Sequence, residues 1–390
     1  MHHARQAIEV IAAMGTIASI AYFTLCLWSA VGFLRGMRKS KSAAGSARPI
    51  QPVSILKPLR GADPEIYQSL RSHCVQDYPE YEIVFGVNVQ NDAAVETVER
   101  LKTEFPRLAI QLVICEQNLG ANIKVSNLAQ MLPVARYENL IVNDSDIRVE
   151  RDYLRRVLQP LSDPTVGMVT CLYRGVAAPT LGSRLESLGI STDFCAGVLA
   201  ARQIEGGMRF GLGSTLAFRR RDLEAIGGFE SIADYLADDY EIGRRLAAHG
   251  YRVCLSEVIV ETFLPDYSLR EYVRHQLRWA RSIRDSRRWG YMGLLVTFGF
   301  PWAFVNLLVT RGAGWAWGLL AIALGLRLSV AWLVGGVVLR DRQIIDHSWL
   351  IPLRDLIAPA IWVLSLTGHT VAWRGDTFLL KHGKMVRMSL

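Results

Sequence analysis

The most apolar stretches of the chain lie near its two ends. Residues 10–34 contain no charged side chain and are long enough for one helix to cross the ~30 Å of hydrocarbon in a bilayer. After about residue 290 the chain becomes apolar again, which predicts further spans at 291–310 and 314–339 and a weaker one at 349–373. Because the weaker stretch contains two prolines, an arginine and an aspartate, it either crosses the bilayer or forms a re-entrant element.

Between these ends, short β-rich runs alternate with segments of helical period. The predicted strands are 53–57, 82–87, 110–115, 140–144, 167–173 and 214–220. The predicted helices between them include 64–75, 93–104 and 121–132. This alternation indicates an α/β domain with a mostly parallel, Rossmann-like sheet. Ligands of such sheets bind at the carboxyl ends of the strands, so we look for chemistry there.

The two patterns together predict six segments. They are an N-terminal transmembrane helix (8–34), a basic linker (35–50), the α/β domain (51–267), an amphipathic interfacial helix (268–289), a C-terminal membrane region (290–373) and a basic tail (374–390). The membrane region holds two spans plus either a third span or the re-entrant element.

Composition and charge agree with a membrane protein. Hydrophobic residues make up 51% of the chain and the mean hydropathy is +0.19, both high for a soluble enzyme. The net charge of +8 comes from basic residues that gather beside the apolar runs, which favours a membrane surface over nucleic acid. Five basic residues follow the first span and one precedes it, which places the α/β domain in the cytoplasm: Arg35, Arg38, Lys39, Lys41 and Arg48, against Arg5. The six cysteines show neither a CxxC pair nor metal-ligand spacing, which is typical of a reducing compartment.

The first motif with chemical potential is NDSDI at 143–147, at the end of an apolar strand. Alternation sends Asp144 and Asp146 to the same side, where two carboxylates can bind a hard divalent cation that also holds a diphosphate. A turn or capping role ahead of a helix at 151–159 explains these aspartates equally well.

The second motif is ADDYEIGRRL at 237–246, which places Asp238, Asp239 and Glu241 at the start of a helical pattern. One aspartate is explained by capping of the helix. The other is a candidate general base, because a carboxylate can accept the proton of a substrate hydroxyl.

The third motif is HQLRWARSIR at 275–284, where arginines recur at helical spacing. An amphipathic helix at a membrane interface explains the outer arginines. Arg278 can instead face a diphosphate, with Trp279 forming a wall of an acceptor pocket.

In this order, Asp92, Asp144, Asp239 and the RW pair at 278–279 resemble the D, D, D, (Q/R)xxRW pattern of family 2-type glycosyltransferases with a GT-A fold. The chain is more similar still to ceramide glucosyltransferases of family 21 and to related bacterial enzymes that glycosylate hopanoid lipids. The similar stretches are SILKPLRGADP (54–64), QDYPEYEIVFGVN (76–88), NLGANIKVSNL (118–128), VNDSDIRV (142–149), GMVTCLYRG (167–175), IGGF (226–229), ADDY (237–240) and HQLRWARSIR. One departure is His275, which stands where many members have Gln or Arg.

The resemblance implies a donor site for a UDP-sugar. It places Lys57, Pro58 and Asp92 at the uridine end of that site. Lys124 and Asn127 line the same cleft.

The resemblance also implies the reacting groups. Asp144 serves the diphosphate and a Mn²⁺ or Mg²⁺ ion, and Asp146, which is variable in such motifs, ranks below it as a metal ligand. Asp239 is the base, and Arg278 and Trp279 close the site.

The implied activity is inverting transfer of a hexose or N-acetylhexosamine from a UDP-sugar to a lipid hydroxyl, at the cytoplasmic face of a bacterial inner membrane. Resemblance in SDIRVERDYL (145–154) and VTCLYRG (169–175) ranks a hopanoid acceptor, bacteriohopanetetrol, ahead of ceramide or diacylglycerol. A polysaccharide synthase needs more spans to line a channel. A non-catalytic membrane scaffold would be expected to lack a key carboxylate, and all three are present.

Overall fold

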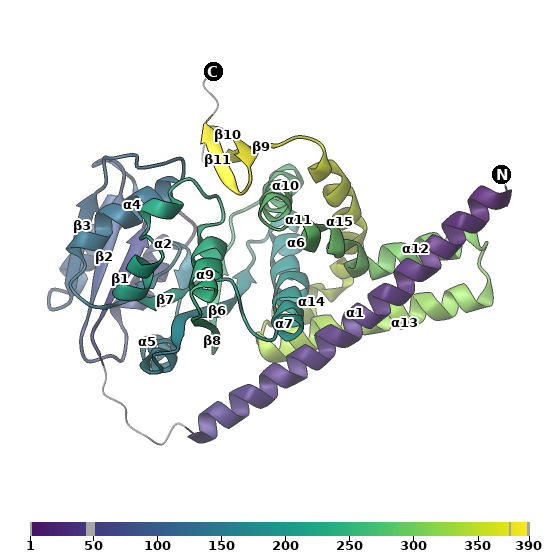
Figure 1. The fold of residues 1–390 in the computed structure, drawn as a ribbon, viewed down its shortest axis with the longest axis horizontal. Coiled ribbons are helices and arrows are strands. Elements are labelled where there is room, and N and C mark those ends of the chain that lie inside the picture. Colours follow the sequence, from purple (N-terminus) through teal and green to yellow (C-terminus); the bar gives the residue numbers. More distant parts are fainter. Residues whose placement is uncertain (1, 44–50, 374–375, 388–390) are drawn as a thin grey trace. The chain divides into compact units, whose positions relative to one another are not determined.

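The computed structural model describes residues 2–43, 51–373 and 376–387, which form two compact units. The first, here called the helical unit, comprises Met1–Lys41, Ala177–Gln203 and Asp266–Arg374. The second, the sheet unit, comprises Ser42–Val176, Ile204–Pro265 and Gly375–Leu390. Many of their helices and strands are labelled in Figure 1.

The sheet unit is built on an eight-stranded sheet with the order β3-β2-β1-β4-β7-β6-β8-β5. Its strands are β1 Val53–Pro58, β2 Tyr81–Val87, β3 Ala109–Ile114, β4 Asn139–Val142, β5 Ile147–Arg148, β6 Val166–Val176, β7 Leu216–Arg219 and β8 Arg252–Phe263. Strands β1 to β4 pair in parallel, whereas β7 runs antiparallel to both β4 and β6. The predicted α/β architecture is therefore confirmed, although the sheet is mixed, and β8, which the sequence analysis did not predict, pairs in parallel with β6.

Helices connect the strands of this unit. They are α2 Ile66–Cys74, α3 Ala94–Glu104, α4 Ile123–Met131, α5 Tyr153–Leu158, α8 Arg220–Ala225 and α9 Asp238–Ala248. Every residue of β1 is buried, which is the pattern of a central parallel strand covered on both faces. Because β1, β2 and β4 are parallel, the loops that follow them leave the sheet at one edge.

The helical unit contains the apolar segments. Its helices are α1 His2–Ala43, α6 Leu181–Gly189, α7 Cys195–Ile204, α10 Leu269–Ser286, α11 Arg288–Gly293, α12 Gly299–Val309, α13 Gly314–Val330, α14 Gln343–His347 and α15 Ile351–Leu366. Within the described residues, three helical stretches are long and apolar enough to cross a membrane: His3–Arg38, Gly314–Val338 and Gln343–Leu366. The pair Arg288–Thr297 and Gly299–Val309 is bent by 54° and adds a fourth only if it counts as one span. Apolar helices at both ends were predicted, and the structure confirms them.

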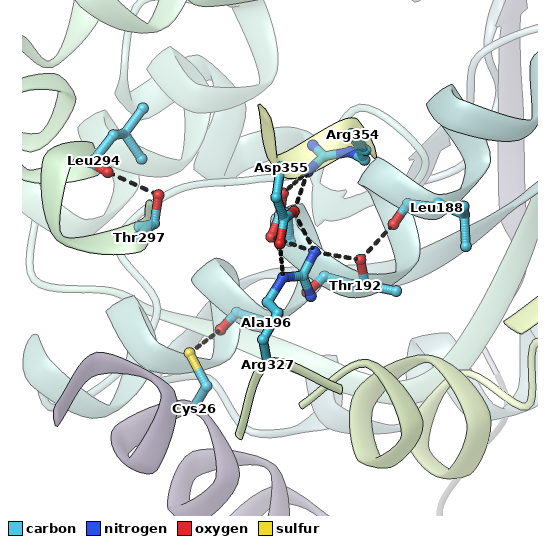
Figure 2. Close-up of polar contacts among 10 residues, drawn as sticks. Cys26, Leu188, Thr192, Ala196, Leu294, Thr297, Arg327, Arg354 and Asp355 are labelled. Atoms are coloured by element: carbon cyan, nitrogen blue, oxygen red, sulfur yellow. Dashed lines mark hydrogen bonds and ion pairs between the residues drawn. The ribbon is translucent and has the colours of Figure 1, made fainter. Parts of the chain in front are cut away.

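A buried charge cluster joins three segments of the helical unit (Figure 2). Arg327 of α13, 1% exposed, donates to Asp355 of α15 at 2.9 and 3.0 Å and lies 3.2 Å from Asp193. Asp193 belongs to a π-helical turn, Ile190–Phe194, between α6 and α7, and also pairs with Arg354. Because charges buried among apolar helices are stable only when paired, this cluster fixes α13, α15 and the π-helical turn against one another.

Residues 376–387, which lie within the predicted basic tail, form a hairpin. Strands β10 Asp376–Lys381 and β11 Lys384–Arg387 pair antiparallel around His382 and Gly383, which have φ angles of 53° and 80°. Positive φ at both central residues is the requirement of a tight two-residue hairpin turn. The backbone of Met385 donates to Asp234 O at 2.7 Å, so the hairpin packs on the segment just ahead of α9.

Candidate active site

The acidic motifs meet at the carboxyl edge of the sheet. Asp144 lies just after β4, and Asp239 lies in the first turn of α9. A methyl group placed on Gly213 would lie 3.0 Å from Asp144 Oδ2 and 3.3 Å from Asp239 Oδ2. The two carboxylates are therefore brought together around Gly213, and the absence of a side chain there keeps the space between them open.

Lys124 links the two acidic motifs. Its Nζ lies 2.8 Å from Asp144 Oδ1 and 3.0 Å from Asp238 Oδ2. These carboxylates raise the pKa of Lys124 against the opposing effect of its burial, so it stays protonated. The structure thus places a fixed positive charge between the loop after β4 and the start of α9.

Asp239 is suited to proton transfer near neutral pH. Burial, followed by repulsion from Asp238, raises the pKa of its carboxyl to about 7, while Lys124 acts in the opposite direction. Its Oδ1 accepts a hydrogen bond from the backbone N–H of Tyr240 at 2.7 Å, which orients the group. A general base works best when its pKa lies near the working pH.

The second aspartate of the DSD motif has a different environment. Asp146 accepts a hydrogen bond from Thr262 Oγ1 on β8, and burial together with Asp144 raises its pKa to about 6. The Asp144 side chain, in contrast, is 41% exposed. In the part of the chain that the structure describes, no group of three or more His, Cys, Asp or Glu side chains is arranged to hold a metal ion.

Lys57 lies underneath the site, away from solvent. Its side chain is fully buried, and its Nζ donates to the backbone oxygen of Asp144 at 3.0 Å and lies 3.5 Å from His73 Nε2. Burial lowers the pKa of Lys57 to about 7. The residue thus supports the turn that carries Asp144, and its neighbour Pro58 is buried in the same strand.

Asp92 and Asn127 hold the surrounding loops. The carboxylate of Asp92 accepts from the backbone N–H of Gly61 at 2.9 and 3.1 Å, which ties the loop after β2 to the loop after β1. Asn127 of α4 exchanges two hydrogen bonds with Asn88 at 2.8 and 3.2 Å. Both residues shape the edge of the sheet at which the carboxylates lie.

Arg278 and Trp279 belong to α10 in the helical unit. Helix α10 starts at Ser268 with a capping box in which Glu271 is the partner, and it covers most of the predicted segment 268–289. The Trp279 ring lies edge-on to Phe194 at 5.6 Å between centroids and 5.7 Å from the ring of His275. Trp279 is therefore set in an aromatic cluster.

The structure adds residues that the sequence analysis missed or set aside. Gly213 lies between the two key carboxylates. Glu186 on α6 is 1% exposed and contacts α10. Glu186 is one of only two acidic residues, with Asp193, in the mostly apolar stretch 185–200, and this was the available signal.

An α/β sheet of this order, with converging carboxylates at its carboxyl edge, defines a GT-A-type glycosyltransferase. A mannosyltransferase from Pyrobaculum calidifontis, solved with GDP-Man and Mn²⁺, has a similar fold, with a TM-score of 0.54 and 22% identity over 92% of this chain and 96% of that one. The sequence matches the model of glycosyl transferase family 21 over residues 11–386, and the chain belongs to that family.

Curated relatives agree with this assignment. Ceramide glucosyltransferase 3 of Caenorhabditis elegans is 24% identical over 345 residues, which cover 86% of this chain and 74% of that protein. The ceramide glucosyltransferase of Komagataella phaffii is 30% identical over 38% of this chain and 30% of its own length. An N-acetylglucosaminyltransferase of Rhizobium meliloti is 26% identical over 60% of this chain and 56% of its own length. The predicted family is confirmed.

Proposed function

We propose that this glycosyltransferase moves a hexose or N-acetylhexosamine from a UDP-sugar to the hydroxyl of a membrane lipid, with inversion at the anomeric carbon. The observation that carries the proposal is the convergence of Asp144 and Asp239 around Gly213, with Lys124 bridging the two acidic motifs. The names of the worm and yeast relatives and the long apolar helices support a lipid acceptor.

Asp239 acts as the general base. As the lipid oxygen attacks the anomeric carbon, the hydroxyl proton passes to the Asp239 carboxylate and the bond from the sugar to the diphosphate breaks. A pKa of about 7 leaves a substantial part of Asp239 ionised at neutral pH and makes it a much better proton acceptor than an ordinary aspartate. One base on the face opposite the leaving group is sufficient for inversion.

Asp144 faces the donor diphosphate. Mg²⁺ and Mn²⁺ sites of this kind use one or two protein carboxylates together with substrate phosphates, and the exposed Asp144 carboxylate fits that requirement. When bound there, the cation neutralises charge on the departing UDP. Lys124 adds a positive charge 2.8 Å from Asp144, directed at the same region.

The remaining residues orient the substrates. Asp92 and Asn127 shape the uridine end through the loops that they hold, and Lys57 supports the Asp144 turn from below. Arg278 and Trp279 contact the diphosphate and the acceptor, respectively. The excess of basic residues that follows the apolar stretch 10–34 supports a cytoplasmic site at a bacterial inner membrane.

We rank the candidate acceptor lipids as the resemblance in the sequence does. A hopanoid, bacteriohopanetetrol, comes first because of the resemblance in 145–154 and 169–175. Ceramide, which the names of the relatives support, or diacylglycerol is the alternative.

The test is sugar transfer by the protein purified in detergent. Labelled UDP-glucose and UDP-N-acetylglucosamine are each offered with bacteriohopanetetrol, ceramide or diacylglycerol in the presence of Mn²⁺, and the lipid products are identified by mass spectrometry. We expect one donor and one acceptor to give a singly glycosylated lipid. The exposed variant Asp77→Asn, 74% exposed at its side chain, should behave as the wild type. No lipid product with any pair would contradict the proposal.

A further inference from the structure

Glu186 is a buried carboxylate with two partners on one neighbouring helix. It lies on α6 and is only 1% exposed. Its Oε1 lies 3.1 Å from His275 Nδ1, and its Oε2 accepts from Gln276 Nε2 at 2.7 Å. Burying an ionised carboxylate costs several kcal/mol unless hydrogen bonds compensate it, so each oxygen is held by a donor from α10.

Helices α6 and α10 are also locked together by their backbones. A methyl group placed on Gly182 would lie 2.4 Å from Tyr267 O and 2.8 Å from Ser268 O, so only glycine allows the start of α6 to approach the start of α10 this closely. Below this contact, Leu185, Leu188 and Tyr272 share one buried cluster. The position of Glu186 relative to α10 is therefore closely determined.

The His275 ring, which contacts Glu186, also lies next to the ring of Trp279. It stacks on Tyr267, with ring centroids 5.4 Å apart and planes inclined by 26°, and lies 5.7 Å from Trp279. Arg278 and Trp279 follow His275 by three and four residues, so all three side chains lie along one side of α10.

We propose that Glu186 is a positioning residue that orients Arg278 and Trp279 through its hydrogen bonds to His275 and Gln276. This inference rests on the proposed function, in which the RW pair closes the donor and acceptor site. Glu186 itself does not touch the substrates.

The proposal accounts for the residue at position 275. His stands there where many proteins with the (Q/R)xxRW pattern have Gln or Arg. All three side chains can donate a hydrogen bond, and a buried carboxylate can accept one from each of them. In this chain the His275 Nδ1 lies 3.1 Å from Glu186 Oε1, within hydrogen-bond distance.

The test compares four variants of the full-length protein in the transfer assay. Glu186→Leu and His275→Leu each remove the hydrogen bond, and we expect kcat to fall about 100-fold while KM for the UDP-sugar changes less than about threefold, because a displacement of about 1 Å is sufficient for such a loss. His275→Gln keeps a donor and should retain kcat within about threefold. The double variant Glu186→Leu/His275→Leu should lose no more than Glu186→Leu alone, since the contact of His275 with Glu186 is already absent in that variant.

A control separates positioning from general loss of stability. Glu271→Ala removes the capping box of α10 without touching Glu186 or His275, so we expect it to lower the unfolding temperature with kcat reduced less than about threefold. Unchanged kcat in Glu186→Leu would overturn the inference. The inference would also be overturned if the reduction in kcat of the double variant equalled the product of the two single reductions, because the two residues would then act independently.

Hydrogen exchange of residues 275–284 provides a readout that does not depend on sugar transfer. We expect faster exchange in Glu186→Leu than in the wild type, and equal exchange would contradict the coupling between α6 and α10. If the wild type transfers no sugar while this difference in exchange is present, the proposed function fails and the contact stands. If the wild type is active and the Glu186 variants match it, the inference alone fails.

Discussion

Asp238→Asn should make the enzyme more active at acidic pH. Asp238 is the residue before the proposed base, and its charge is the second-largest cause, after burial, of the raised pKa of Asp239. The amide keeps the size of the side chain but removes the negative charge. Because only ionised Asp239 accepts the proton of the acceptor hydroxyl, activity rises as the pH passes upward through its pKa.

The size of the effect follows from this pKa. Loss of one like charge at a partly buried site lowers the pKa of its neighbour by about one unit, or ~1.4 kcal/mol. The pKa of Asp239 would then fall from about 7 towards about 6. At pH 6 the ionised fraction would rise from about one tenth to about one half, so the relative activity would increase about fivefold.

The assay is the pH dependence of kcat/KM for the UDP-sugar, which reports the ionisation of the free enzyme. Lys124→Met should move the acidic limb of the pH profile in the opposite direction. Lys124 lowers the pKa of Asp239, so its removal should move this limb to higher pH. An acidic limb that stays in place in Asp238→Asn, or moves upward, would refute Asp239 as the titrating base.

Three further predictions concern stability, the hairpin and the metal. Asp355→Asn leaves the buried Arg327 without its two-oxygen partner, so it should lower the free energy of unfolding in detergent by ~3 kcal/mol. The exposed Asp346→Asn should lower this free energy by less than ~0.5 kcal/mol. Equal effects of the two variants would contradict a stabilising role of the charge cluster. Removing residues 376–390 should lower kcat about tenfold, because the segment ahead of Asp239 loses its hydrogen bonds to the hairpin, and an unchanged kcat would argue against that support. EDTA should reduce transfer at least about 100-fold with recovery in Mn²⁺, whereas activity that persists in EDTA would rule out a required cation.

The sheet was predictable wherever its strands are continuous apolar runs. Strands β1, β2 and β4 are buried along nearly their whole length, so their sequences leave little ambiguity. Strand β8 was missed because its buried and half-exposed residues alternate and Ser256 and Glu257 interrupt the apolar pattern. Its pairing with β6 also shifts register between Thr170 and Leu172, which is a property of the assembled sheet and not of either strand.

The sequence of the C-terminal hairpin contains a local pattern typical of a hairpin, but its many basic residues led us to predict a tail. Phe378, Leu380 and Met385 are buried on one side, and the His382–Gly383 pair forms the turn between them. The surrounding basic residues instead suggested a tail. Alternation flanking a glycine-containing pair is the stronger indicator, because it follows from backbone geometry.

The motifs that contribute to the site could be predicted from the sequence, but the contacts between their side chains could not. Resemblance placed Asp144 and Asp239 together, and the structure brings them around Gly213. The resemblance placed Lys57 at the uridine end of the donor site. In the structure this side chain, on a strand buried on both faces, points into the protein and supports the Asp144 turn. Glu186 meets its partner 89 residues away, and no local pattern encodes such a contact.

The most direct test of the central claim uses Asp239→Asn. The variant keeps the shape of the side chain but cannot accept the hydroxyl proton, while the binding of UDP should be unaffected because the diphosphate is held elsewhere. Transfer of labelled sugar to lipid and the affinity for UDP are measured on the same purified samples. We predict loss of transfer by at least about 1,000-fold with UDP affinity within about threefold of the wild type. Transfer at the wild-type rate would contradict the account.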